Sequence, residues 1–250
     1  SFNGVPYTYE ILTKIGLQNI KIKSLKYLTH AGGKLEKNKL KKIIRFTKKN
    51  KLKFFSMYGQ TEASPRISYL KSELSEKKIG SVGKGVPGCK IYLIDNDGKK
   101  ILKPFKEGEI ICEGNNVFMG YSSSYKDLNK PNEVNFKLKT GDLGFLDKDG
   151  FFYITSRVDR ISKVFGNRID LGDLESLMSQ KGYQIASISD NKKIFIFIEK
   201  KYNKIKLINT ISKITNLSNS SFEIIKLRYF PRTSNNKISF NELRKINARL

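Results

Sequence analysis

A short apolar run that leads into a tyrosine, a glycine and a hydroxyl–carboxylate pair constrains this chain more than any other feature. Residues 54–57 read Phe-Phe-Ser-Met and predict a buried strand. The chain continues Tyr58-Gly59-Gln60-Thr61-Glu62, in which Gly59 allows a sharp exit from the strand. These residues suit a nucleotide, because a ring can stack on a base, a donor can bind phosphate and a carboxylate can ligate Mg²⁺. Taken alone, they also fit an ordinary strand and turn.

The charge of the chain raises the question of nucleic-acid binding. The formal net charge is +25, but 39 of the 48 basic residues are lysines, and they are spread along all 250 residues. Base readout favours arginine, and single-strand binding needs aromatic residues interleaved with the charges. We therefore expect a solvated basic surface rather than a specific nucleic-acid site, with weak attraction to RNA or anionic lipid from charge alone.

Other features of the sequence bear on where the protein is located and on the state of its two cysteines. There is no apolar run of about 18 residues that would predict a transmembrane helix. The first six residues lack the basic and apolar regions of a signal peptide, and the chain begins with Ser1, so it reads as a piece of a longer protein. Cys89 and Cys112 are isolated within strand-like segments. We expect buried free thiols in a cytoplasmic protein rather than a disulfide or a metal pair.

The first part of the chain has the pattern of an α/β fold. A strand over 25–29, a helix over 35–50 and a strand over 54–57 predict the last crossover of a mostly parallel sheet. From residue 79 to 152 the pattern changes to short strands separated by Gly and Asp turns, at 91–94, 108–112 and 151–154. This second stretch predicts a small β-barrel or a distorted sheet.

A further change of pattern follows Arg157. Helices near 171–179 and 205–214, with strands near 185–188, 194–199 and 223–229, predict a small α+β domain. We place the boundary at Asp159, which gives domains of residues 1–158 and 159–250. The predicted fold class is therefore α/β plus α+β: the end of a mixed α/β sheet subdomain, a small β-rich subdomain and a small mobile C-terminal α+β domain.

Five segments share one chemistry when they are taken in order. They are Tyr58 to Glu62; Gly108-Glu109-Ile110 with Gly114 and Gly120-Tyr121; Thr140-Gly141-Asp142; Ser156 to Ile169, which includes Arg157, Asp159 and Gly166; and Pro231-Arg232-Thr233-Ser234-Asn235-Asn236-Lys237. In the third segment we expect Asp142 to project from a tight turn and to bind the vicinal hydroxyls of a sugar. Singly, each segment has a plain structural interpretation, such as a turn, a surface ion pair or one more lysine.

Together the segments resemble the adenylate-forming superfamily of acyl-CoA synthetases, luciferases and peptide synthetase adenylation domains. The corresponding family motifs read YGxTE, GE(L/I)xxxGxxxxxGY, TGD, GRxDxxxKxxGxRI and PxTxxGK. The opening Gly4-Val5-Pro6 and the later Ala31-Gly32-Gly33 also fit. The resemblance spans nearly the whole chain. It implies that a carboxylic acid is activated with ATP to an acyl-adenylate and then transferred to a thiol.

The resemblance also implies a role for each matching residue. Tyr58 stacks on adenine, Gly32, Gly33 and Gly59 lie beside the nucleotide, Thr61 binds the α-phosphate and Glu62 ligates Mg²⁺. Asp142 and Arg157 bind the ribose hydroxyls, Asp159 is the hinge of the small domain, and Gly166 lines the thiol tunnel. Lys237 is the catalytic cation of adenylation, with Thr61 and Glu62 beside the same reaction. The implied cofactors are ATP or AMP, Mg²⁺, and CoA or a carrier protein's phosphopantetheine.

Departures from the family pattern limit what this chain can do alone. Ser156 and Asn236 replace glycines, with little expected effect because one is small and the other tolerates a left-handed backbone. The family's Ser/Thr/Gly-rich phosphate loop does not occur in these residues. The chain thus resembles the C-terminal half of such an enzyme, with the missing N-terminal half in the same or a separate chain. We expect the isolated fragment to be inactive.

Two classes of function remain open from the sequence. The first is an ATP-dependent acid–thiol ligase that uses CoA or a carrier protein. The second is a non-catalytic remnant or interaction module that binds AMP weakly. The intact ligand set favours the enzyme, since a drifting remnant would be expected to lose one or more of these side chains.

Overall fold

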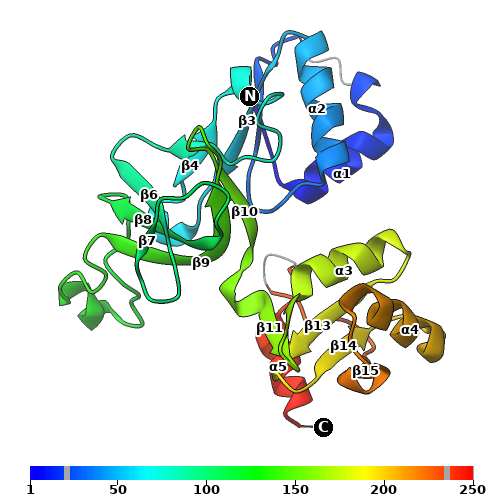
Figure 1. Ribbon diagram of the computed structural model, residues 1–250. Coiled ribbons are helices and arrows are strands. Elements are labelled where there is room, and N and C mark those ends of the chain that lie inside the picture. The colour runs from blue at the N-terminus through cyan, green and yellow to red at the C-terminus, as the bar shows by residue number, and fades with distance from the viewer. Residues whose placement is uncertain (20–22, 234–236, 250) are drawn as a thin grey trace. The chain divides into compact units, whose positions relative to one another are not determined.

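The chain divides into two units, Ser1–Thr155 and Ser156–Leu250. The computed structural model describes residues 1–19, 23–233 and 237–249 (Figure 1). The boundary expected at Asp159 falls three residues after this division. The predicted fold class is confirmed, because a mixed α/β sheet, a β-rich sheet and an α+β unit follow one another along the chain.

The first unit begins with a mixed five-stranded sheet. Its strands are parallel from β1 to β3 and antiparallel from β3 to β5. In spatial order they are β1 (Phe2–Gly4), β2 (Tyr27–His30), β3 (Lys53–Tyr58), β4 (Ser68–Leu70) and β5 (Lys84–Gly85). The helices that connect the parallel strands are α1 (Pro6–Ile15) and α2 (Lys37–Lys49). The strand–helix–strand crossover predicted around residues 25–57 is thus confirmed.

The two helices pack on the same face of this sheet. The buried residues of α2 are Leu40, Ile43, Ile44 and Thr47, and its lysines lie on the opposite side. Tyr9 of α1, the apolar residues of α2 and Phe54 of β3 share one core. The opposite face of the sheet carries Tyr27 and Phe55, whose rings meet edge to face with centroids 6.0 Å apart. This alternation along β3 sends Ser56 and Tyr58 to the same side of the strand as Phe54.

The rest of the first unit is an open, twisted sheet rather than a barrel. Its spatial order is β10 (Phe152–Arg157), β9 (Lys137–Leu146), β8 (Gly108–Gly114), β6 (Cys89–Ile94) and β7 (Lys100–Ile101). The buried side chains of its core include Leu93, Ile110, Cys112 and Phe152. The ten-residue strand β9 was not predicted, because Gly141 and its neighbours read as a turn.

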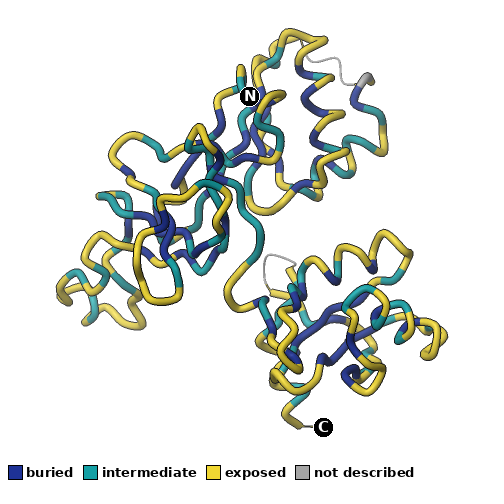
Figure 2. Tube along the Cα trace, in the orientation of Figure 1, coloured by how far each residue is buried: buried dark blue, intermediate teal, exposed yellow. Residues whose placement is uncertain are grey.

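The second unit is a three-stranded sheet covered on both faces. Its strands are β13 (Ile185–Ser189), β14 (Ile194–Ile198) and β15 (Phe222–Lys226), with β14 in the middle. Every residue of β14 is buried, as Figure 2 shows for this region. Ile194, Ile196 and Ile198 join the core beneath α3 (Leu171–Gln180) and α4 (Lys204–Thr215). Phe195 and Phe197 join the core beneath α5 (Phe240–Asn247).

A hairpin precedes this sheet, formed by β11 (Ile161–Val164) and β12 (Asn167–Asp170). The predicted helices and strands of this unit are confirmed, whereas α5 was not predicted. Helix α1 was not predicted either, although Pro6 stands at its first position, where proline is favoured. No helix in the described parts of the chain is long and apolar enough to cross a membrane.

Candidate functional site

Two motifs that are far apart in the sequence meet in the first unit. Tyr58 is the last residue of β3, and its hydroxyl donates a hydrogen bond of 2.6 Å to Oδ2 of Asp142 in β9. Both side chains are buried, each with about 8% exposure. Burial, reinforced by the negative charge of Asp142, raises the pKa of Tyr58, so the phenol stays protonated and donates. The YGQTE and TGD segments therefore form one local structure.

Asp142 does not leave a tight turn, and that expectation was wrong. It lies within β9 at a bulge, where residues 140–142 of β9 oppose only Ile110 of β8. Gly141 adopts φ +70°, which lets the extra residues bulge out without ending the strand. Thr140 Oγ1 donates to the Ile110 carbonyl at 2.7 Å and accepts from the Asp142 amide at 3.1 Å. The bulge thus aims Asp142 at Tyr58.

Glycine is required at position 59 because the backbone of Pro65 lies very close to it, not because Gly59 has an unusual φ. A Cβ at this position would lie 1.9 Å from the Pro65 carbonyl oxygen. A 3₁₀ helix of one turn, Thr61–Ala63, follows Gly59 and Gln60, and Thr61 is exposed. Glu62 is half-buried, and its Oε1 accepts a hydrogen bond of 2.6 Å from the Tyr121 hydroxyl. Thr61 and Glu62 are therefore presented directly after the strand that carries Tyr58.

The Gly32–Gly33 loop lies against the opening of the chain. The Ala31 amide donates to the Gly4 carbonyl at 3.2 Å. Gly32 adopts φ +81°, and a Cβ on Gly33 would lie 3.1 Å from the Pro6 ring. The two segments of the resemblance that flank α1, Gly4 to Pro6 and Ala31 to Gly33, are thus neighbours at the carboxyl ends of β1 and β2.

The remaining predicted site residues belong to the second unit. Arg157 ends β10, and its Nε lies 3.2 Å from Oδ1 of Asp159 in an exposed ion pair. The Asp159 carbonyl accepts from Arg244 of α5 at 3.5 Å. Gly166 adopts φ +80° in the turn between β11 and β12, with open space where a Cβ would stand.

Lys237 is exposed and follows three residues, including Asn236, that lie outside the described part of the chain. Both the carbonyl and the amide of Lys237 form hydrogen bonds with Thr233. The Lys237 carbonyl accepts from the Thr233 amide at 2.8 Å, and the Lys237 amide donates to Thr233 Oγ1 at 3.3 Å. These bonds join Thr233 to Lys237, the two described residues on either side of 234–236.

Several polar residues support the first-unit site and were given no role from the sequence. Gln60 Nε2 donates to the Thr140 carbonyl at 3.2 Å, and Glu109 Oε1 accepts from the Gly141 amide at 3.2 Å. Asn116 Nδ2 donates to the carbonyls of Ala63 and Arg66. Gln60, Glu109 and Tyr121 lie inside the motif segments, so motif membership was the available signal. Asn116 occupies an unspecified position of the second motif, between Gly114 and Gly120, so the motif gave no signal for it.

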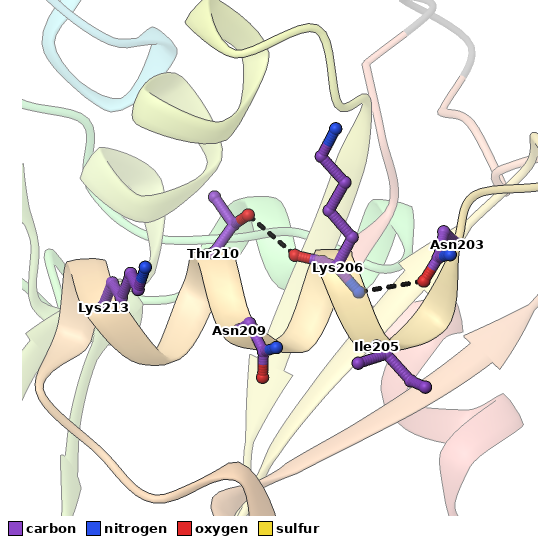
Figure 3. A pocket seen from close by; sticks show the side chains of 6 residues that line it. All are labelled: Asn203, Ile205, Lys206, Asn209, Thr210 and Lys213. Carbon is purple, nitrogen blue, oxygen red and sulfur yellow. Dashed lines mark hydrogen bonds between the residues drawn. The ribbon is translucent and has the colours of Figure 1, made fainter.

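A hollow on the second unit involves none of these residues. Figure 3 shows its lining, which comes from α4 and the N-cap residue before it: Asn203, Ile205, Lys206, Asn209, Thr210 and Lys213. Because one helix and its cap supply every lining residue, the hollow is a feature of the helix surface. It is not part of the site built around Tyr58 and Asp142.

The fold of the chain is similar to that of solved adenylate-forming enzymes. The solved o-succinylbenzoate CoA synthetase of Bacillus subtilis, in complex with its acyl-adenylate intermediate, superimposes with a TM-score of 0.73 at 26% sequence identity. The structure of the same enzyme with ATP and magnesium superimposes with a TM-score of 0.71. Both comparisons cover 97% of this chain and 50% of the solved chain.

The sequence comparisons agree with the structural ones. Residues 1–122 match the family of AMP-binding enzymes. The 2-succinylbenzoate–CoA ligase of Bacillus subtilis (strain 168) is 38% identical over 127 residues, which are 50% of this chain and 25% of that ligase. Residues 1–122 thus match the AMP-binding family, and the chain as a whole is similar to part of the solved adenylate-forming enzymes. It spans about half the length of the solved relatives it matches.

Proposed function

We propose that the chain is the C-terminal portion of an AMP-forming acid–thiol ligase and that its first unit binds the adenylate. The observation that carries this proposal is the hydrogen bond between Tyr58 and Asp142, which joins two motifs 84 residues apart. Strand ends and bulges that bring such polar groups together are where α/β folds place ligands.

In this proposal the roles in the first unit follow from chemistry. Tyr58 stacks on adenine while its hydroxyl is held by Asp142, and Asp142 accepts from the ribose hydroxyls. Gly32 and Gly33 let the backbone approach the base. Thr61 donates to the α-phosphate, which its exposed position after β3 favours.

A magnesium ion is implied by the relative solved with ATP and magnesium. Glu62 fits as its ligand, because a half-buried carboxylate is the kind of oxygen donor that Mg²⁺ takes together with substrate phosphates. Within the described residues, no group of three or more His, Cys, Asp or Glu side chains gathers to hold a metal. The ion would therefore need nucleotide oxygens, and it would offset phosphate charge.

The second unit is proposed to complete the reaction. Arg157 donates to the ribose, and Lys237 holds the carboxylate and α-phosphate oxygens during adenylation. Asp159 is proposed as the hinge and Gly166 as part of the path of the thiol. These assignments rest on motif positions and, for Lys237, on its hydrogen bonds with Thr233.

The acceptor is proposed to be CoA, with a carrier protein's phosphopantetheine as the other acceptor to test. The acid to test first is 2-succinylbenzoate, because the curated relatives reported above are ligases of that acid. The ligase is proposed to work in the cytoplasm, where cysteines stay reduced, because both cysteines of the chain are free.

The direct test is AMP binding to the 250-residue chain, measured by isothermal titration calorimetry. We expect Asp142→Ala to weaken binding about tenfold or more, because hydrogen bonds to a charged group contribute about 1.5–3 kcal/mol. The matched control is Asp97→Ala, which removes an exposed carboxylate from a turn in the same unit. Equal affinities of Asp142→Ala and the parent chain would overturn the proposal, as would an absence of AMP binding.

A further inference from the structure

The two cysteines of the chain are free and buried, as expected, and they are also neighbours in space. Cys89 begins β6 and Cys112 lies in β8, its antiparallel neighbour. Their Sγ atoms are 3.0 Å apart. Both thiols are free and buried, with Cys89 8% exposed and Cys112 fully covered. Closing a disulfide, whose S–S bond is about 2.05 Å, therefore needs an approach of only about 1 Å.

The pair is chemically unequal. The two thiols share a hydrogen bond in which either sulfur can be the donor. That bond lowers the pKa of Cys89, against the opposing effect of burial. The same hydrogen bond, together with burial, raises the pKa of Cys112. The two thiols also differ in exposure: Cys89 is 8% exposed and Cys112 is fully covered, so a peroxide from solvent reaches Cys89 first. The thiolate is the form of cysteine that attacks oxidants.

We propose that Cys89 and Cys112 form a reversible oxidation site that a peroxide closes to a disulfide. The Cys89 thiolate attacks one peroxide oxygen and breaks the O–O bond, which leaves Cys89 sulfenic acid and, with hydrogen peroxide, a hydroxide that is protonated to water. The Cys112 sulfur then attacks Cys89 Sγ, and the S–S bond forms as the sulfenic oxygen departs with the Cys112 proton. Two thiols and one hydrogen peroxide give one disulfide and two waters.

The oxidation site lies directly beside the segment proposed to bind the α-phosphate. The side chain of Asn116 lowers the pKa of both thiols, after the larger effects of the partner thiol and of burial. Its Nδ2 donates to the carbonyls of Ala63 and Arg66, and its main-chain carbonyl accepts from Ser64 Oγ at 2.9 Å. Through these hydrogen bonds we expect motion of the two sulfurs to reach the turn that carries Thr61. The oxidation site itself does not depend on the proposed function. Only an effect of oxidation on nucleotide binding rests on that function.

The test begins with the reduced chain and hydrogen peroxide. Free thiols are blocked with N-ethylmaleimide after oxidation, and the digest is mapped by mass spectrometry. We expect one linked pair of peptides, containing Cys89 and Cys112, that dithiothreitol separates. Thiols that remain open to blocking, links between different molecules, or over-oxidised cysteine without a link would each overturn the proposal.

Two variants separate the roles of the cysteines. In Cys112→Ser, the sulfenic acid of Cys89 should accumulate and be captured by dimedone, because no resolving thiol is present. In Cys89→Ser, Cys112 should give no dimedone adduct. Similar adducts in the two variants would contradict the assignment of Cys89 as the attacking thiol.

Hydrogen–deuterium exchange tests the link to the nucleotide segment without requiring any activity. We expect disulfide formation to change the exchange of peptides that cover residues 61–66. A disulfide that leaves this exchange unchanged would overturn the link. AMP titration of the reduced chain then reports separately on the proposed function.

Discussion

At the scale of single residues, burial decides the chemistry of several groups. His30 ends β2 with 5% exposure, and neither ring nitrogen has a hydrogen-bond partner among the described residues. Its ring packs against Tyr9, with centroids 5.9 Å apart. Burial lowers the pKa of His30 to about 4. The imidazole is therefore neutral in the folded chain at physiological pH.

This histidine predicts an acid-sensitive stability. Between about pH 6.5 and pH 4 the unfolded chain binds the proton and the folded chain does not, so stability falls as the pH falls. We expect a loss of about 2 kcal/mol between pH 7 and pH 5 from this group. Urea unfolding at both pH values measures it. His30 is the chain's single histidine, so His30→Leu should remove this part of the slope; equal slopes in the two proteins would refute the prediction.

Lys237 is the residue whose role depends most on motif position. Among 39 lysines, its place in the motif and its hydrogen bonds with Thr233 set it apart. In the complete enzyme we expect Lys237→Ala to slow adenylate formation by about a hundredfold, the scale of losing one placed electrostatic stabiliser. Pyrophosphate exchange measures this step. Thiol transfer from a supplied acyl-adenylate should persist, and unchanged exchange would remove the catalytic role.

At the scale of elements, a buried ion pair anchors the start of the second unit to its sheet. Arg160 follows Asp159 and is 7% exposed. Its Nη2 lies 2.6 Å from Oε1 of Glu175 in α3, and its Nη1 donates to the Ser187 carbonyl of β13 at 2.8 Å. Burial raises the pKa of Glu175, and the Arg160 charge opposes that rise. The guanidinium also stacks on Phe240 of α5, 3.8 Å from the ring centre.

Breaking this pair should destabilise the chain strongly. Arg160→Met leaves Glu175 buried without its cation, and the loss of one partner of a buried pair costs about 3–5 kcal/mol. Urea unfolding followed by circular dichroism measures the change. The control is the double variant Arg160→Met/Glu175→Gln, which removes the orphaned charge and should recover part of the stability. Arg160→Met with the stability of the parent chain would contradict an anchoring role.

At the scale of the whole molecule, the division into two units gives the proposed hinge a physical setting. Asp159 lies in the 3₁₀ turn Val158–Arg160, close to the division after Thr155. In the complete enzyme, Asp159→Pro should fix φ at this residue and impair one half-reaction more than the other. Separate assays of adenylation and thiol transfer measure the two steps. Equal losses in both would argue against a hinge.

The sequence by itself determined the elements whose cues are local. Apolar periodicity predicted α2, α3 and α4, and the buried strands β3 and β14 followed from short apolar runs. The motif segments identified Tyr58, Asp142 and Lys237 as candidates. Such cues are readable because each depends on residues only a few positions apart.

Only the tertiary structure decided how distant segments combine. The bulge that aims Asp142 at Tyr58 depends on pairing between β8 and β9, and Gly141 reads as a turn until that pairing is known. The contact between Cys89 and Cys112 likewise depends on the register of β6 with β8. Strand pairing is set by the packing of a whole sheet, so no short stretch of sequence encodes it.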